Sequence, residues 1–247
     1  MKYFNSLLAT LGCTLLLLSV AMASDWQTLA PGFEYNKTNQ NNIIPWCTMH
    51  AFRIDLTRYH FDIVTAKKLH QKAITVGDVM HKTPALLAIN AGFFDKNHQA
   101  LGLRVAHSQL LTPLKNISWW GVFAVKNNRA SIFGVHHYPQ KYQPEFALQS
   151  GPRLIIHQKI PKLKSGFAER SALCITNEGK AIIIVTENAA MSTTVLASIL
   201  RSPPFDCVDA INLDGGSSSQ LFARINGFEY HVPGFSQISD ALVVLPN

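Results

Sequence analysis

Short apolar runs separated by turn residues recur through most of the chain, and this pattern limits its fold more than any other feature. Asn226-Gly227 separates two such runs, over 221–225 and 228–232, which is a strong signal for a tight β-hairpin. Asn127-Asn128 and Asn177-Glu178-Gly179 indicate two further hairpins. Other runs predict strands over 48–56, 61–66, 85–89, 121–125, 130–135, 153–156, 171–176 and 181–186.

Only two segments show clear helix signals. Thr75 is a candidate N-cap for a helix over 76–81, and Ser192 or Thr193 for a helix that ends at Arg201, before two prolines. We therefore expect an α+β protein, a single domain with a large twisted, mainly antiparallel β-sheet and a few helices.

The first 23 residues have the composition of a secretory signal peptide. Lys2 precedes a leucine-rich run over 4–20, and Ala21-Met22-Ala23 is an A-x-A cleavage site, so the mature chain is expected to begin at Ser24. The alternatives are a lipid anchor at Cys13 or an uncleaved membrane anchor, but the run is short. We expect an exported protein, periplasmic or secreted, without stable membrane insertion after cleavage.

Residues 24–247 contain no repeat, linker or low-complexity tract, so we expect one domain. Three cysteines remain there, Cys47, Cys174 and Cys207. They allow at most one intramolecular disulfide, and the three pairings stay open.

No metal motif is present. Cysteine spacings do not suit zinc, no H-E-x-x-H occurs, and the adjacent His136 and His137 would point apart on a strand. We expect no cofactor, with a divalent ion not excluded.

The formal net charge is +7, which favours anionic partners such as a phosphorylated glycan or a wall polymer. Nucleic acid is the alternative. Lysines and arginines are scattered, however, and the densest group, Lys159, Lys162 and Lys164, comes without a nucleic-acid motif. We expect no nucleic-acid partner.

The stretch over 211–221, INLDGGSSSQL, carries the strongest chemical signal. Asp214 follows an apolar run and is itself followed by two glycines and three serines, Gly215, Gly216, Ser217, Ser218 and Ser219. Glycines allow backbone amides to approach a ligand closely, and hydroxyl groups add donors, so the segment is suited to phosphate or sugar. An ordinary strand-turn segment is the alternative. No G-x-S-x-G elbow is present, which argues against a serine nucleophile.

A second strand-like run, LLAINAGFFD, ends in polar and aromatic residues. Asn90 and Gly92 are followed by Phe93, Phe94 and Asp95. Aromatic faces pack on sugar rings or in the core. In a separate aromatic segment, SWWGVFAV, we expect one of the two tryptophans to be buried and the other exposed.

Together these stretches resemble the signature segments of the phosphodiester glycosidase family. The matching pieces are INAGFFD at 89–95, LQSGPRLI at 148–155, ERSALCI at 169–175 and NLDGGSSSQL at 212–221, and the resemblance spans 50–245. Cys174 stands where a glycine is expected. The resemblance implies an exported hydrolase that cleaves the glycosidic bond of a sugar-1-phosphodiester, with free sugar and a phosphomonoester as products.

Within this frame, Asp214 is the first candidate for a catalytic carboxylate. Glu187, at the end of an expected strand, is the preferred partner, with Glu169 and Asp95 behind it. Arg170 precedes another strand and is suited to bidentate phosphate binding. The alternatives are a structural turn aspartate, solvated loop carboxylates and an arginine paired inside the protein.

Further binding candidates are Arg104, a second cation, Asn90, which can bond sugar hydroxyls, and Ser150-Gly151, which can present backbone amides. Asn90 and Ser150-Gly151 are alternatively explained as partners of a buried strand end. The predicted substrate-binding set is Asn90, Gly92, Phe93, Phe94, Asp95, Arg104, Ser150, Gly151, Gly215, Gly216, Ser217 and Ser218. Two other functions remain open: a non-catalytic module that binds phosphorylated glycan, and a different glycosidase or phosphodiesterase on the same scaffold.

Overall fold

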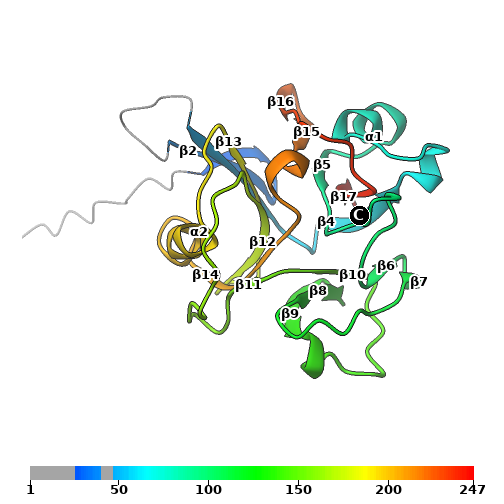
Figure 1. Ribbon diagram of the computed structural model, residues 1–247. Helices are drawn as coiled ribbons and strands as arrows, with labels where there is room; N and C mark the ends of the chain where they lie inside the picture. Colours follow the sequence, from blue (N-terminus) through cyan, green and yellow to red (C-terminus); the bar gives the residue numbers. More distant parts are fainter. Residues whose placement is uncertain (1–25, 40–46) are drawn as a thin grey trace, which may run out of the picture.

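Three antiparallel β-sheets surround one central core (Figure 1). The computed structural model describes residues 26–39 and 47–247, so the expected signal segment and Cys13 lie outside the described residues. The sequence predicted a mainly antiparallel α+β fold, and this is confirmed. The strands form three sheets rather than one large sheet, because chain segments far apart in sequence pair with one another.

The largest of these sheets has seven strands, in the order β1-β2-β3-β13-β12-β14-β11. Their bounds are β1 (Gln27–Ala30), β2 (Phe33–Asn39), β3 (Thr48–Ile54), β13 (Ala181–Glu187), β12 (Ser171–Thr176), β14 (Cys207–Asn212) and β11 (Arg153–Ile155).

The other two sheets have five strands each. One runs in the order β16 (Phe228–Val232), β15 (Leu221–Ile225), β5 (Leu87–Asn90), β17 (Asp240–Pro246) and β4 (Tyr59–Thr65). The other runs in the order β7 (Gln109–Thr112), β6 (Arg104–Ala106), β10 (Phe146–Ser150), β8 (Gly121–Lys126) and β9 (Arg129–Gly134).

Side chains alternate between the central core and the outer faces, as the period of two along a strand requires. In β13, Ile183 and Val185 face the central core, whereas Ile182 and Ile184 face outward into a second cluster. Strands with apolar residues on both faces must be covered on both sides, which explains why their runs are continuously apolar.

Two helices cover the outer faces. Helix α1 (Val76–Lys82) begins at Thr75, whose side chain forms a capping box with Asp78, and it packs against the sheet that contains β5. Helix α2 (Thr193–Arg201) begins at Ser192 and covers the seven-stranded sheet. Both predicted caps are confirmed, and Ser192 rather than Thr193 is the cap of α2. Short 3-10 turns are η1 (Lys67–Leu69), η2 (Val135–His137) and η3 (Gly216–Ser218).

The three predicted hairpins are present. Asn127, Asn128, Asn226 and Gly227 all have positive φ angles, as the tight turns that join β8 to β9 and β15 to β16 require. One local expectation is wrong, because His136 and His137 lie in the turn η2 and not on a strand.

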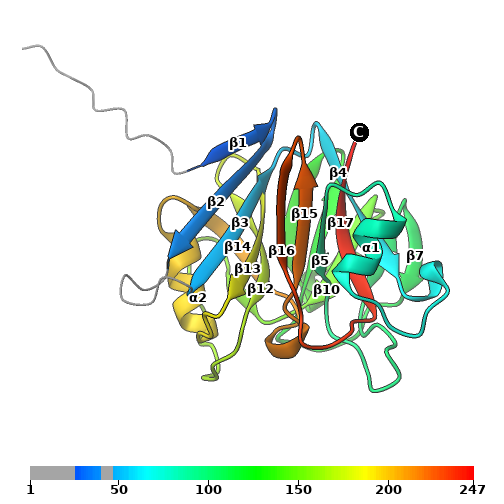
Figure 2. The same cartoon turned by 90° about the horizontal axis from the view of Figure 1, so that it is seen from above.

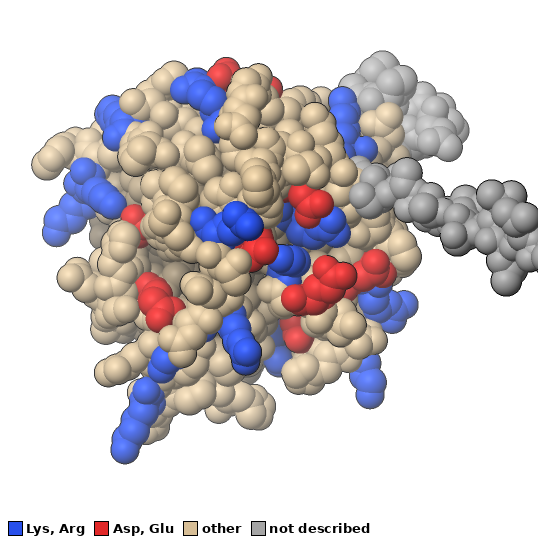
Figure 3. All heavy atoms as spheres, turned by 180° about the vertical axis from the view of Figure 1, so that it is seen from behind, with Lys and Arg blue, Asp and Glu red and all other residues tan. Residues whose placement is uncertain are grey.

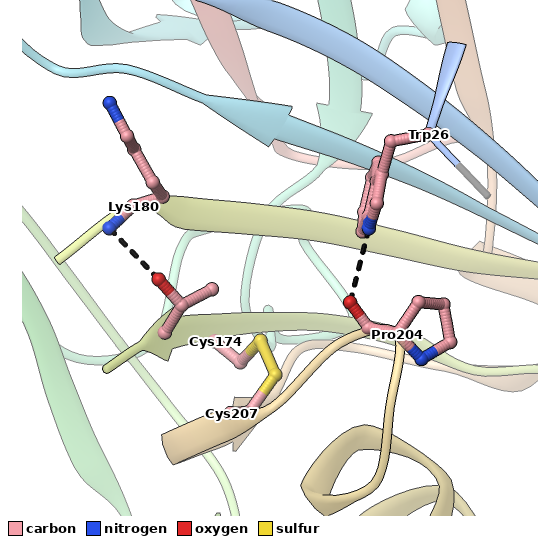
Figure 4. Close-up of a disulfide and its surroundings, with 6 residues drawn as sticks. Trp26, Cys174, Lys180, Pro204 and Cys207 are labelled. Carbon is pink, nitrogen blue, oxygen red and sulfur yellow. Dashed lines mark hydrogen bonds between the residues drawn. A yellow bond between two sulfur atoms is a disulfide. The ribbon is translucent and has the colours of Figure 1, made fainter. Parts of the chain in front are cut away.

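A disulfide joins Cys174 of β12 to Cys207 of β14, with the two Cα atoms 5.8 Å apart (Figure 4). The pairing is set by register, since Thr176, two residues beyond Cys174, is the direct partner of Cys207. The cysteine at 174, where the resemblance leads one to expect glycine, thus forms a cross-strand bond. Beside it, Trp26 Nε1 donates a hydrogen bond to the Pro204 carbonyl at 3.1 Å (Figure 4).

The polar segments singled out in the sequence leave their strands at one end of the molecule. β5 ends at Asn90, β10 at Ser150 and β14 at Asn212, while β12 begins at Ser171 and β17 at Asp240. Backbone hydrogen bonds join these ends, for example from Ala91 N to Asp240 O and from Asn212 N to Pro152 O. Figure 2 shows this end along the lower edge of the molecule, where the turn after β14 is drawn in orange.

Candidate functional site

The turn after β14 carries Asp214 and is fixed on two sides. Asp214 N donates to the Ala91 carbonyl at 3.2 Å, and Asn90 Nδ2 donates to the Asp214 carbonyl at 2.7 Å. On the other side, Gly216 N donates to the Glu169 carbonyl at 2.8 Å. A Cβ atom at Gly215 would lie 2.8 Å from that same carbonyl, so only glycine fits there. The turn therefore bridges the end of β5 and the segment before β12.

The Asp214 carboxyl group is set apart from ordinary surface carboxylates. Burial raises its pKa, the charge of Asp240 raises the pKa further, and hydrogen bonds from Ser218 and from the Gly215 N–H oppose the shift. The Gly215 bond to Asp214 Oδ1 is 3.0 Å long. A half-buried carboxyl group with a raised pKa is a candidate for proton transfer.

Asn90 joins three strand ends through its side chain. Its Oδ1 accepts hydrogen bonds from Ser171 Oγ at 2.7 Å and from Gln220 N at 3.2 Å, and its Nδ2 donates to the Asp214 carbonyl. The side chain is fully buried. These contacts agree with the strand-end alternative for Asn90 and make it a residue that positions the Asp214 turn.

Arg170 lies beside the same turn. Its Nε donates to the Met191 carbonyl at 2.8 Å and its Nη2 to the Gly166 carbonyl at 2.6 Å. Its Nη1 is 4.0 Å from the position that a Cβ atom on Gly215 would take, and within residues 26–39 and 47–247 no acceptor binds Nη1. Its partners are therefore carbonyl groups and not the internal carboxylate that the sequence offered as an alternative.

Arg104 occupies a different environment. The side chain is fully buried, its Nε donates to Asp240 Oδ2 at 2.6 Å, and its Nη1 donates to three carbonyls, of which Gln149 is the nearest at 3.0 Å. A Cβ atom on Gly92 would lie 2.9 Å from Arg104 Nη2. Arg104 thus lies behind the Gly92 segment, in a buried ion pair.

The structure brings Glu187 to the same end but into its own hydrogen-bonded group. Glu187 Oε2 accepts from Tyr230 Oη at 2.8 Å and from His50 Nε2 at 3.1 Å, while His50 Nδ1 accepts from Tyr35 Oη at 2.8 Å. Burial lowers the pKa of His50 to about 4, so the ring is neutral at pH 7. Sequence reasoning missed His50 and Tyr230, because a lone polar residue within a strand gives no signal.

Glu169, the reserve candidate, is held by its neighbours. Its Oε2 accepts from Thr186 Oγ1 at 2.5 Å and its Oε1 from Ala189 N at 2.9 Å. Asp95 closes a local turn in a similar way, since its Oδ1 accepts from the backbone N–H groups of Asn97 and Gln99. Both carboxylates serve as acceptors for nearby protein groups.

The two phenylalanines of the Asn90 segment point to different surroundings. The ring of Phe93 lies 5.1 Å from the ring of Trp120 and 6.4 Å from that of Trp119. Phe94 stacks on His98 and packs on the cluster beneath α1. As expected, one tryptophan is buried, Trp120, and the other, Trp119, is exposed.

Buried polar side-chain atoms without a hydrogen-bond partner among the described residues gather at this end of the sheets. They are Arg104 Nη2, Trp120 Nε1, Ser150 Oγ, Asn212 Oδ1 and Ser219 Oγ. Native proteins contain few such atoms, and a group of them in one place is typical of a site that takes up water or a ligand. Within the described part of the chain, no group of three or more His, Cys, Asp or Glu side chains is arranged to hold a metal ion.

A cavity of about 570 Å³ lies apart from the Asp214 turn. It is lined by β9 and by residues around β11, among them Phe133, Arg153 and Asp209. The charged and hydrogen-bonding groups described above do not line it, so we place the candidate site at the shared strand ends.

Charged side chains are mixed on the face opposite to the view of Figure 1. Figure 3 shows basic side chains in several places on this face, with acidic side chains among them. Among the described residues, Arg53 pairs with Glu34 and Arg224 with Glu229, each at 2.6 Å. On this face the positive net charge does not form a continuous basic surface.

Comparisons with known proteins agree with the sequence resemblance. A sequence model described as phosphodiester glycosidase matches residues 83–245. The uncharacterized protein YigE of Escherichia coli K12 is 25% identical over 126 residues, which are 46% of this chain and 50% of that protein, so the chain matches about half the length of this relative.

Solved structures share the fold. The zebrafish N-acetylglucosamine-1-phosphodiester alpha-N-acetylglucosaminidase catalytic domain, auto-inhibited by its pro-peptide, superimposes with a TM-score of 0.68 at 19% identity, covering 90% of this chain and 86% of that one. A hypothetical protein from Synechocystis gives a TM-score of 0.58 at 17% identity, covering 87% and 62%. A protein of Burkholderia pseudomallei K96243, named as a candidate exported protein, gives 0.61 at 12% identity, covering 81% and 74%.

Proposed function

Because the chain belongs to the phosphodiester glycosidase family, we propose that it is an exported hydrolase that cleaves the glycosidic bond of a sugar-1-phosphodiester. Water adds to the anomeric carbon, the bond from that carbon to the phosphate oxygen breaks, and the products are free sugar and a phosphomonoester. The observation that carries the proposal is the Asp214 turn, which holds a half-buried carboxyl group of raised pKa and whose Gly215 lies against the Arg170 guanidinium.

The leaving group sets the demands on the site. A phosphate departs with negative charge, so stabilising that charge matters more than protonating the oxygen. Arg170 Nη1, which faces Gly215, and the N–H and hydroxyl donors of the Gly-Ser turn are the groups that we assign to the phosphate. Asp214 is assigned to the sugar side, where a carboxylate activates water or stabilises the developing positive charge.

For the second carboxylate we keep Glu187. Its side chain is 26% exposed, whereas that of Asp240, the other carboxylate that acts on Asp214, is only 1% exposed, so a substrate reaches Glu187 more readily. β12 separates β13 from β14, so the two strand ends are two strand spacings apart, roughly 10 Å. His50 and Tyr230 fix the position of the Glu187 carboxylate.

The remaining predicted residues take supporting places in this proposal. Phe93 presents a ring beside the Asp214 end, and Ser150-Gly151 lies next to Trp120 and Gly92. Asn90, Gly92 and Arg104 position these segments. Export rests on the N-terminal segment and would be tested by fractionation and by the mass of a mature chain that begins at Ser24. In the described residues, no helix is long and apolar enough to span a bilayer.

The decisive experiment follows bond cleavage in ¹⁸O-labelled water on a panel of sugar-1-phosphodiesters. The proposal expects label in the free sugar, none in the phosphomonoester, and loss of turnover in Asp214→Asn. Asp209→Asn, in the strand β14 that precedes the Asp214 turn, is the matched control and should retain turnover. Label in the phosphate would indicate a phosphodiesterase instead, and binding without turnover of any substrate would indicate a non-catalytic glycan-binding module.

A further inference from the structure

Three aromatic side chains are exposed at the end of the molecule that carries Asp214. Trp119 is 53% exposed, Phe167 78% and Phe235 88%, and in the described part of the chain no other Trp or Phe is as exposed. They belong to three different loops, which lie between β7 and β8, between β11 and β12, and between β16 and β17. Exposed large apolar residues that gather around a polar site mark a binding surface.

Each of the three residues is tied to the site by a contact. Phe235 N donates to the Ser217 carbonyl at 2.9 Å. Phe167 lies between Gly166, whose carbonyl accepts from Arg170 Nη2 at 2.6 Å, and Ala168, whose Cβ is 4.0 Å from the Cβ position of Gly216.

Trp119 makes an edge contact with Phe93, at 6.4 Å between ring centroids, and Phe93 follows Gly92. We call Trp119, Phe167 and Phe235 the aromatic rim. Its members thus approach the Asp214 turn from separate loops.

Two of these loops carry positive charge, and the segment 233–239 around Phe235 carries none. Lys115 precedes Trp119, and Lys162 and Lys164 precede Phe167; all three lysines are exposed. The segments 113–120, 160–168 and 233–239 contain no Asp or Glu. Rings that stack on sugars, mixed with ammonium groups that bind phosphate, complement a chain in which sugar units and phosphate groups follow one another.

We propose that the aromatic rim binds a phosphate-bearing glycan of several sugar units and places one of its sugar-1-phosphodiester bonds at the Asp214 turn. The substrate class is thus an anionic oligosaccharide or polymer rather than a single sugar diester, and this assignment rests on the proposed function. A lipid surface fits the rim less well. In the turn that the rim loops contact, Ser217 is exposed and Asp214 and Gly216 are half-buried, and contact with hydrocarbon would desolvate these polar groups without replacing their hydrogen bonds.

The test compares oligomers of two to six sugar units, linked through 1-phosphodiesters, with a single sugar-1-phosphodiester. Wild-type kcat/KM should rise with oligomer length. Trp119→Ala, Phe167→Ala and Phe235→Ala should each lower the ratio of kcat/KM for the longest over the shortest substrate by about three- to tenfold, the range expected for loss of one stacking contact. Leu110→Ala, which removes a 65% exposed apolar side chain from β7, is the matched control and should leave the ratio unchanged.

Three results would overturn the inference. They are a wild-type kcat/KM that does not depend on length, a ratio that the rim variants do not change, and rim-dependent sedimentation with vesicles of anionic phospholipid, which would identify a membrane surface instead. Oligomer binding to the Asp214→Asn variant, measured by calorimetry with and without each rim substitution, separates this inference from the hydrolysis. If the oligomer binds through the rim but is never cleaved, the proposed function fails and the glycan-binding rim stands.

Discussion

Replacing Arg104 by methionine distinguishes a structural arginine from one that binds substrate. The sequence assigned Arg104 to the substrate as a second cation, yet the side chain is fully buried and its Nε is 2.6 Å from Asp240 Oδ2. Methionine keeps most of the apolar length and removes the charge. We expect Arg104→Met to act mainly on stability, because it leaves the Asp240 carboxylate buried without a counter-charge.

The expected loss is large. Removing one partner of a buried, hydrogen-bonded ion pair costs about 3–5 kcal/mol. Arg104 Nη1 also donates to the carbonyls of Leu101, Leu103 and Gln149, so the loss should fall in the upper part of that range. Since single domains are stable by about 5–15 kcal/mol, the variant should lose about a quarter or more of its free energy of unfolding.

The measurement is urea unfolding followed by circular dichroism at pH 7, with Arg153→Met as the matched control. Arg153 is half-buried and makes no ion pair among the described residues, so its substitution should cost less than about 1 kcal/mol. The double variant Arg104→Met/Asp240→Asn should lose less than the sum of the single variants, because the unpaired charge is gone. If Arg104→Met lowers the free energy of unfolding by less than about 1 kcal/mol and raises KM, this reasoning is refuted, and Arg104 is a substrate-binding residue.

Three further predictions concern pH and the disulfide. The pKa of His50 is lowered from 6.5 to about 4, so the wild-type protein should lose about 3 kcal/mol of its free energy of unfolding between pH 7 and pH 4. The variant His50→Gln should not show this loss. An equal dependence of the free energy of unfolding on pH in both proteins, measured by urea unfolding, would contradict this. The pKa of Asp214 is raised by burial, so this group lowers the stability of the fold as pH rises above 3.8. The Tm of Asp214→Asn should therefore exceed that of the wild-type protein by more at pH 7 than at pH 3.5. A Tm difference that does not depend on pH would show that burial does not raise the pKa of Asp214. The Cys174–Cys207 bond spans a sequence separation of 33, so replacing both by alanine should cost about 3–4 kcal/mol in chemical unfolding while Cys47→Ala costs little; equal losses would argue against the pairing.

Local features of the fold were predictable because their causes are local. Asn226-Gly227 specifies a tight turn through the φ angles of two residues, and Ser192 specifies a helix start through one hydrogen bond to Val195 N. The division into three sheets has no local cause. β5 pairs with β15 and β17, which lie more than 120 residues further along the chain, and apolar runs alone do not select such partners.

The candidate site divides in the same way. The Asp214 turn was found because glycines and serines after a strand mark a turn whatever the fold. The environments of Glu187 and Arg104 were not predictable, since they depend on which strands come to lie opposite. His50 reaches Glu187 across 137 residues of sequence, and Asp240 reaches Arg104 across 136. The disulfide follows the same rule, because only the β12–β14 register brings Cys174 and Cys207 together.

Asn90 shows why the site and the fold are coupled at this end. One buried amide accepts from Ser171 and Gln220 and donates to the Asp214 carbonyl, so it joins strand ends from two sheets and fixes the turn between them. Any substitution at Asn90 changes both the packing of the sheets and the position of the carboxyl group, and a loss of activity there does not separate binding from folding. The Asp214 side chain is different, because its shift comes from burial and from the charge of Asp240 rather than from backbone ties to other strands. Replacement of Asp214 by asparagine therefore removes the carboxylate while the backbone contacts of the turn remain, which makes position 214 the place where chemistry can be tested apart from structure.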